Sequence, residues 1–99
     1  MLNKEKVIFQ DALRTWGKTS QVFMSIEEMG ELIQALSKNF RGKENLDNIA
    51  EEITDVEIMI DQLKLIFDVE KRCSEIRVEK VDGLKNRLEV LSWKKVRHT

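Results

Sequence analysis

The stretch LDNIAEEITDVEIMIDQLKLIF, residues 46–67, decides the fold expected for this chain. Its apolar residues recur at alternating intervals of four and three, the spacing of one face of an α-helix. These positions are Ile49, Ile53, Val56, Ile60, Leu63 and Phe67. The pattern predicts a long amphipathic helix that begins at Leu46 or Asp47.

The segment before this helix has the same helical character. One apolar stripe is formed by Ile26, Met29, Ile33, Leu36 and Phe40, and a second begins with Leu32 and Ala35. We therefore expect a helix that is buried on more than one side, with Thr19 or Ser20 as its N-cap. The polar residues 39–45 include a glycine and two asparagines, which predicts a connecting loop.

Two further helices are expected at the ends of the chain. The first runs from about Leu2 to Trp16, with Gly17 as its stop. The last follows Asp68, a candidate cap, and contains Gly83, which costs about 1 kcal/mol relative to alanine and allows a kink or close packing. Its buried stripe has two equally good phases. One contains Cys73, Ile76, Lys80, Leu84, Arg87 and Leu91, and the other contains Val81, Leu84, Leu88 and Leu91.

Length and composition favour one all-α domain over residues 1–99. The chain has 41% hydrophobic and 35% charged residues and no proline, which suits long helices with solvated faces. Four helices with short connections predict a four-helix bundle, either antiparallel within one chain or half of an intertwined pair. Because a chain this short buries little surface alone, we expect a homodimer or homotetramer.

The same composition argues against several classes of partner. A net charge of -1 provides no basic field for nucleic acid, and only Lys94, Lys95, Arg97 and His98 at the C-terminus would favour such binding. No apolar run is long enough to span a membrane. One cysteine, Cys73, cannot form an internal disulfide, and we expect a cytoplasmic protein.

Two acidic motifs suggest a metal site. The sequence reads EEMGE at residues 27–31 and EEITD at residues 51–55. Side chains three residues apart leave the same face of a helix, so each helix offers two oxygen ligands. These ligands are Glu28, Glu31, Glu52 and Asp55. Such a set suits Mg²⁺, with Mn²⁺ as a second option.

The competing interpretation of each motif alone is a solvated helix face, which is the commoner origin of such spacings. Three observations favour the metal. The carboxylates border the apolar positions of their helices, and four of them close together would repel one another unless a cation lay between them. Third, Lys80 and Arg87 fall on the apolar stripe of the last helix in its first phase, where a cation at the edge of the core needs an anionic partner.

The paired motifs resemble those of the MazG-like all-α nucleotide pyrophosphohydrolases, relatives of the dimeric dUTPases. The resemblance covers about Trp16 to Leu63 and is strongest in Glu27–Leu32 and Glu52–Val56. It implies hydrolysis of a nucleoside triphosphate to the monophosphate and pyrophosphate, in nucleotide-pool housekeeping. It also implies that the four carboxylates bind the metal and that Glu27 orients the attacking water or binds a further metal.

Cations and a base-recognition wall are needed to complete such a site. Lys38, Arg41, Lys80 and Arg87 are candidates to bind phosphate oxygens, although each is equally explained as a surface charge. Candidates for the base are Trp16, Gln21, Phe23, Met59 and Gln62. For Trp16 and Phe23 a plain core position is the favoured alternative.

A second function fits the same sequence. The chain would then be a non-catalytic helical oligomerisation module, with apolar stripes that build the assembly and carboxylates that form a solvated rim. The response to metal separates the two hypotheses.

Overall fold

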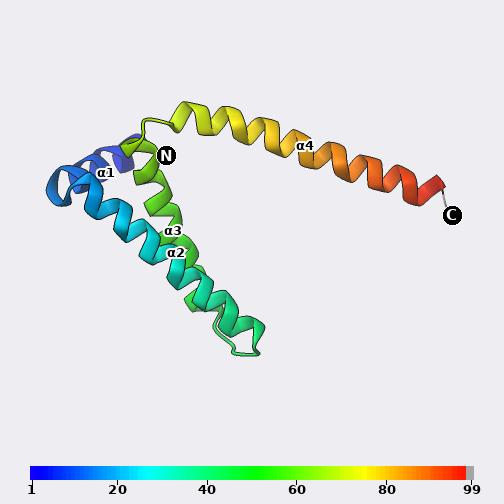
Figure 1. Ribbon diagram of the computed structural model, residues 1–99, viewed down its shortest axis with the longest axis horizontal. Helices are drawn as coiled ribbons and strands as arrows, with labels where there is room; N and C mark the ends of the chain where they lie inside the picture. Colours follow the sequence, from blue (N-terminus) through cyan, green and yellow to red (C-terminus); the bar gives the residue numbers. More distant parts are fainter. Residues whose placement is uncertain (98–99) are drawn as a thin grey trace. The chain divides into compact units, whose positions relative to one another are not determined.

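The computed structural model describes residues 1–97, and over them its regular secondary structure consists of helices alone (Figure 1). The helices are α1 (Asn3–Trp16), α2 (Lys18–Phe40), α3 (Leu46–Ile66) and α4 (Glu70–Arg97). The all-α class and four helices are therefore confirmed. None of these helices combines the length and apolar character that crossing a bilayer requires.

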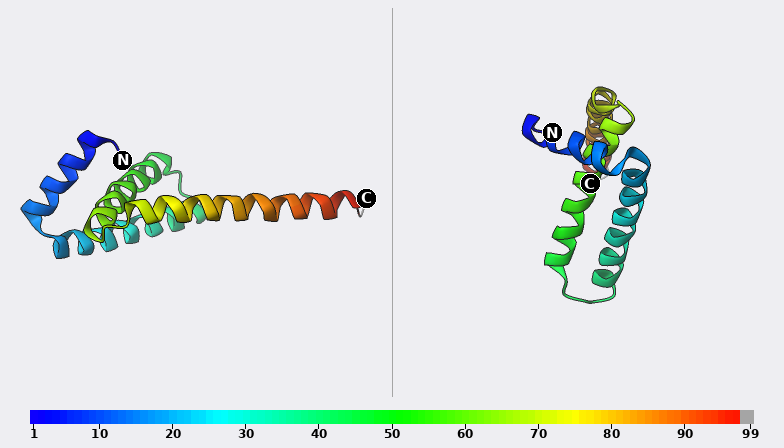
Figure 2. Two further views of the ribbon diagram at one scale, coloured as in Figure 1. Left: turned by 90° about the horizontal axis from the view of Figure 1, so that it is seen from above. Right: turned by 90° about the vertical axis from the view of Figure 1, so that its left-hand side faces the viewer.

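The chain divides into two compact units, residues 1–68 and 69–99. The first contains α1, α2 and α3, and the second contains α4. In the first unit α2 and α3 lie side by side as an antiparallel pair joined by a short loop, and α1 packs on both at the end away from that loop (Figures 1 and 2). The bundle of four helices and its assembly into an oligomer stay predictions.

Glycine sets the junction between α1 and α2. Gly17 has φ of +88°, a conformation that favours glycine, and its N–H donates to the Leu13 carbonyl (2.9 Å). The prediction that Gly17 ends the first helix is confirmed. Thr19 and Ser20 do not cap α2, because the Gly17 carbonyl already accepts from the Gln21 N–H (3.2 Å) and starts the helical ladder at Lys18.

The loop between α2 and α3 is Arg41–Asn45, shorter by two residues at its start than predicted. Gly42, at φ of +100°, allows its own N–H and that of Lys43 to bond back to Asn39 and Lys38 (2.9 and 3.1 Å), which satisfies the last carbonyls of α2. Asn45 then fastens the loop to α2, since its Nδ2 donates to the Ala35 carbonyl (3.0 Å).

Asp68 ends α3 instead of capping α4. Its φ is +52°, a left-handed conformation that aspartate tolerates better than most residues, and its N–H donates to the Leu65 carbonyl (3.3 Å). The ladder of α4 starts at Val69, whose carbonyl accepts from the Cys73 N–H (2.8 Å). Both predicted helices exist, but the residue thought to begin one terminates the other.

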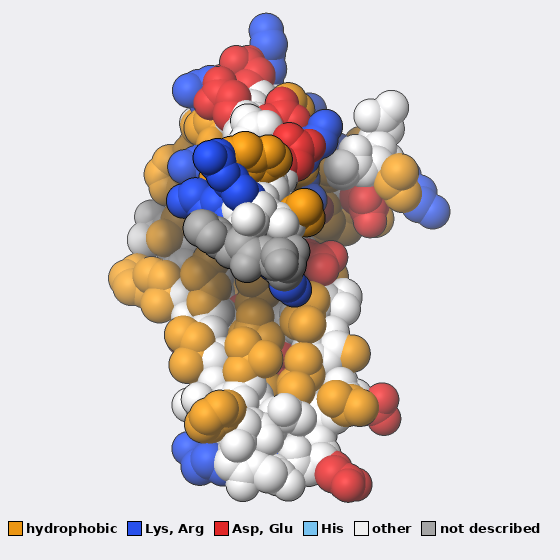
Figure 3. Space-filling model, turned by 90° about the vertical axis from the view of Figure 1, so that its right-hand side faces the viewer, with side chains coloured by type: hydrophobic (Ala, Val, Ile, Leu, Met, Phe, Trp, Pro, Cys, Tyr) orange, Lys and Arg blue, Asp and Glu red, His pale blue; other side chains and the backbone are white. Residues whose placement is uncertain are grey.

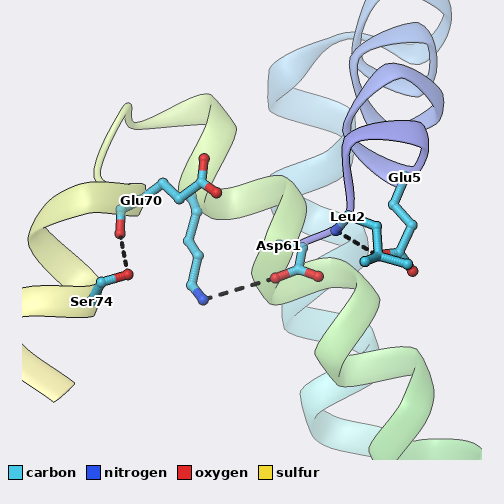
Figure 4. A network of polar contacts seen from close by, with 6 residues as sticks. Leu2, Glu5, Asp61, Glu70 and Ser74 are labelled. Atoms are coloured by element: carbon cyan, nitrogen blue, oxygen red, sulfur yellow. Dashed lines mark hydrogen bonds and ion pairs between the residues drawn. The ribbon is translucent and has the colours of Figure 1, made fainter. Parts of the chain in front are cut away.

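Local bonds also stabilise helix starts and turns (Figure 4). The Leu2 N–H donates to the Glu5 carboxylate (2.9 Å) at the start of α1. In α3 Lys64 pairs with Asp61 (3.8 Å), and in α4 the Ser74 hydroxyl donates to the Glu70 carbonyl (3.2 Å). These contacts are exposed or half-buried, and each contributes little to stability.

The core of the first unit is small and partly polar. Its buried residues are Phe9, Gln21, Ser25, Ala35, Val56, Met59 and Gln62. The apolar stripe of α2 from Ile26 to Phe40 was expected to be buried but faces outward. The small and polar side of α2 faces the core instead. Ile33 is 64% exposed and Phe40 is 92% exposed. Hydrophobic side chains consequently spread over the surface of this unit (Figure 3).

Helix α4 has no buried residue, and both predicted phases of its stripe stay open. It runs through Gly83 without a break. Close packing at Gly83 stays a prediction. Lys94, Lys95 and Arg97 belong to this helix and not to an irregular tail, whereas His98 lies outside the described residues.

We expect Ala35→Leu to lower the free energy of unfolding by about 1–3 kcal/mol, because added methylenes force a packed site apart. Ala35 is only 2% exposed and its carbonyl holds the loop. Urea denaturation at one protein concentration measures the change. Gln34→Leu, the same new side chain on the exposed neighbour, is the control, and equal stability of the two variants would contradict the observed packing.

Candidate metal centre

The side of α2 that faces the core carries one carboxylate. Buried and half-buried positions follow one another along it at intervals of four and three residues. They are Gln21, Ser25, Glu28, Leu32 and Ala35. This spacing keeps side chains on one face of a helix, so Glu28 lies within the α2 contact surface and not on its solvated side.

The matching side of α3 carries two more. Val56, Met59 and Gln62 are buried, and Asp55 precedes Met59 by four residues and Gln62 by seven, while Glu52 precedes Met59 by seven. Glu52 and Asp55 are half-buried on this face. The expectation that the carboxylates border the core is confirmed for Glu28, Glu52 and Asp55, whereas Glu31 is exposed.

Three of the four predicted ligands form one cluster. Glu28, Glu31 and Glu52 each offer a carboxylate oxygen, and these oxygens all lie within 4.8 Å of one another. Glu31 is exposed, whereas the other two are half-buried. The fourth residue, Asp55, lines a cleft of about 140 Å³ together with Glu28, Ile58 and Met59. The structure thus brings all four together, and their ligation of a metal stays a prediction.

Two oxygens of the cluster are buried without a partner. They are Glu28 Oε2 and Glu52 Oε2. The other oxygen of Glu52 receives a long hydrogen bond from Asn48 Nδ2 (3.5 Å). A buried acceptor without a partner is unfavourable for folding, so these two oxygens are the part of the cluster where a cation is predicted to bind.

The electrostatics of the cluster agree with this geometry. Burial raises the pKa of Glu28, and the negative charges of Glu31 and Asp55 raise it further. Burial likewise raises the pKa of Glu52, again reinforced by Glu31 and Asp55. Two ion pairs of the first unit involve other carboxylates, Asp11 with Arg14 and Asp61 with Lys64. Both raised pKa values reflect burial first and neighbouring negative charge second.

The predicted phosphate-binding cations lie apart from the cluster or in the other unit. Lys38 and Arg41 are exposed at the end of α2, and Lys38 lies seven residues after Glu31, about 10 Å along a helix axis. Lys80 and Arg87 are exposed on α4. Glu27 is exposed on α2 beside Glu28. Their roles stay predictions.

The predicted base-recognition residues fall into two groups. Gln21, Met59 and Gln62 are buried together: Gln21 Nε2 donates to Gln62 Oε1 (2.7 Å), and Gln62 Nε2 contacts Met59 Sδ (3.7 Å). Trp16 and Phe23 are each 64% exposed, so the core position favoured for both is wrong in this chain, because each lies on the outer side of its helix.

Asn48, a neighbour of the cluster through its hydrogen bond to Glu52, was not among the residues predicted from the sequence. It precedes Glu52 by four residues, a spacing at which helical side chains meet, so the signal was present. An asparagine near the start of a helix is, however, first expected to be a capping residue, so its contact with Glu52 was not predicted.

The metal-free protein should lose stability as pH rises. Because the folded-state pKa of Glu28 and of Glu52 lies above the ordinary 4.5, the folded chain binds more protons than the unfolded one, and stability falls as pH rises from 4.5 through the folded values. We expect Glu52→Gln to raise the melting temperature at pH 7 without metal, by more than it does at pH 4. Glu57→Gln, exposed on α3, is the control, and a decrease at pH 7 would contradict the assignment.

Comparison with known proteins finds no match to a family model, a curated protein or a solved structure. The resemblance to the MazG-like family therefore remains one of motifs and their spacing.

Proposed function

We propose that this chain is a Mg²⁺-dependent hydrolase that converts a nucleoside triphosphate and water into the monophosphate and pyrophosphate. The observation that carries the proposal is the meeting of carboxylates from two helices, with one buried, unpartnered oxygen on Glu28 and one on Glu52. A solvated rim would leave these oxygens in water, where they need no partner.

The donor set supports Mg²⁺ or Mn²⁺. All the candidate ligand atoms are carboxylate oxygens, which hard divalent cations prefer, whereas zinc sites favour nitrogen and sulfur. When bound, the metal would neutralise triphosphate charge and lower the pKa of a coordinated water. Glu28, Glu31, Glu52 and Asp55 would hold it from both helices.

The remaining steps fall to other side chains. Glu27 would accept a proton as water oxygen bonds to the α-phosphorus and the bond from that phosphorus to the pyrophosphate oxygen breaks. Lys38, Arg41, Lys80 and Arg87 would bind phosphate oxygens, since charge-assisted hydrogen bonds are the strongest that side chains offer. The exposed rings of Trp16 and Phe23 are available to stack on a base.

Assembly would complete both the core and the site. The outward stripe of α2 comprises Ile26, Met29, Ile33, Leu36 and Phe40, which are 36–92% exposed. A continuous apolar surface of this kind is unusual on a monomer. Packing of a second copy on it would bury the stripe and bring further cations toward the carboxylates, so we propose a homodimer or homotetramer.

The second candidate function, an oligomerisation module without catalysis, is favoured by the same exposed stripe. It differs from the hydrolase in its response to metal. A ligand held only by the folded chain stabilises it by about 2.7 kcal/mol at a concentration of 100 times its Kd, whereas a module with a solvated acidic rim gains little.

We expect Glu52→Gln and Asp55→Asn each to abolish pyrophosphate release from a panel of nucleoside triphosphates with Mg²⁺, because the amides keep the shape but lose the charge. Circular dichroism should show nearly unchanged helix content. Glu57→Gln should retain the wild-type rate. Full activity in either site variant would refute the metal assignment, and a wild-type melting temperature insensitive to Mg²⁺ and Mn²⁺ would favour the module.

We expect the wild-type chain to sediment as at least a dimer at micromolar concentration. Ile33→Glu, which places a charge on the outward stripe of α2, should shift it toward the 11.6 kDa monomer and lower turnover at least tenfold. Gln34→Glu introduces the same charge one position away and should leave both unchanged. A fully active monomer would rule out the coupling of assembly and activity.

A further inference from the structure

A hydrogen bond between two buried amides crosses the interface of α2 and α3. Gln21 Nε2 donates to Gln62 Oε1 at 2.7 Å, and the two residues are 6% and 5% exposed. Gln62 Nε2 also contacts Met59 Sδ (3.7 Å), and in the same buried region the Ser25 hydroxyl donates to the backbone carbonyl of Gln21 (2.8 Å).

The position of this pair relative to the acidic cluster is regular. Glu28 follows Gln21 by seven residues on α2, and Asp55 precedes Gln62 by seven on α3. Seven residues are two helical turns, so the side chain returns to the same face about 10 Å further along. Because the helices run antiparallel, the alignment that pairs the two amides also sets Glu28 opposite Asp55.

A second polar contact lies on the other side of the cluster. Ala35 follows Glu28 by seven residues, and Asn48 precedes Asp55 by seven. The alignment therefore sets Ala35 opposite Asn48. Asn45 links the two, because its Nδ2 donates to the Ala35 carbonyl (3.0 Å) and to Asn48 Oδ1 (3.2 Å). The carboxylates thus lie between two directional contacts.

The cluster needs such restraint. Its carboxylates repel one another before any cation binds, and the apolar contacts beside them, such as those of Val56 and Met59, are not directional and resist sliding or rotation poorly. Buried polar pairs are known to fix the alignment of packed helices where apolar side chains allow several.

We infer that the Gln21–Gln62 hydrogen bond is a positioning device that fixes the register of α2 on α3 and holds the carboxylates together before metal binds. The part of the inference that concerns metal binding rests on the proposed function. The part that concerns the register of α2 on α3 is independent of it.

The test replaces both amides with leucine, which has a similar volume. Removing both partners of a buried hydrogen bond is nearly neutral for stability, whereas removing one leaves the other unsatisfied. Q21L/Q62L should therefore melt close to wild type, and each single variant should melt lower.

Mn²⁺ binding, followed by the electron paramagnetic resonance of free Mn²⁺, should nevertheless weaken at least tenfold in the double variant. Leu63→Ala, which removes a half-buried apolar contact beside Gln62, should lower the melting temperature and keep the Kd within twofold of wild type.

Register is measured separately, without metal. Spin labels on Ser20→Cys and Ile60→Cys, in a Cys73→Ser background diluted with unlabelled chain, report the spacing of α2 and α3 within one chain. One narrow distance in wild type and a broad or shifted distribution in Q21L/Q62L are expected. An unchanged narrow distance in that variant overturns the inference, as does a wild-type Kd for Mn²⁺. If wild type itself binds no Mn²⁺, the metal centre is refuted and the distances alone decide the register.

Discussion

Negative charge is partly buried where α2 meets α3. Glu28 and Glu52 lie on the contact surfaces of their helices and are drawn partly out of water beside Glu31 and Asp55. Loss of hydration and mutual repulsion both oppose this arrangement. The helix pair must therefore be held together by contacts elsewhere.

Those contacts are few in the first unit, and several are polar. Gln21, Ser25 and Gln62 are buried beside only four buried apolar residues, Phe9, Ala35, Val56 and Met59. Hydrogen bonds are directional and apolar contacts are not. A core with several buried polar side chains therefore favours one alignment of α2 and α3 over other alignments. The loop contributes to the same end, because Asn45 joins the start of α3 to the Ala35 carbonyl.

The outer surface shows the complementary pattern. The inner face of α2 carries small and polar residues, and its large apolar side chains lie on the outer face. Helix α4 has no buried residue. Burial of these apolar side chains would add hydrophobic stabilisation to the small core of one chain. Hydrolase and oligomerisation module therefore share one expectation for this surface and differ only in what the carboxylates do.

The sequence was sufficient to predict the four helices and the two carboxylates on one face of each of α2 and α3, because helical periodicity and i, i+3 spacing are local properties. It did not determine how α2 packs on α3, which brings the carboxylates together, or which side of α2 is buried. The stripe from Ile26 to Phe40 is the more apolar side, yet the side of Gln21, Glu28 and Ala35 faces the core. Nor did it reveal that Asp68 closes α3, or that Gln21 and Gln62, 41 residues apart, share a hydrogen bond. These outcomes depend on which surfaces of different helices fit together, and such long-range complementarity exists only in the tertiary structure.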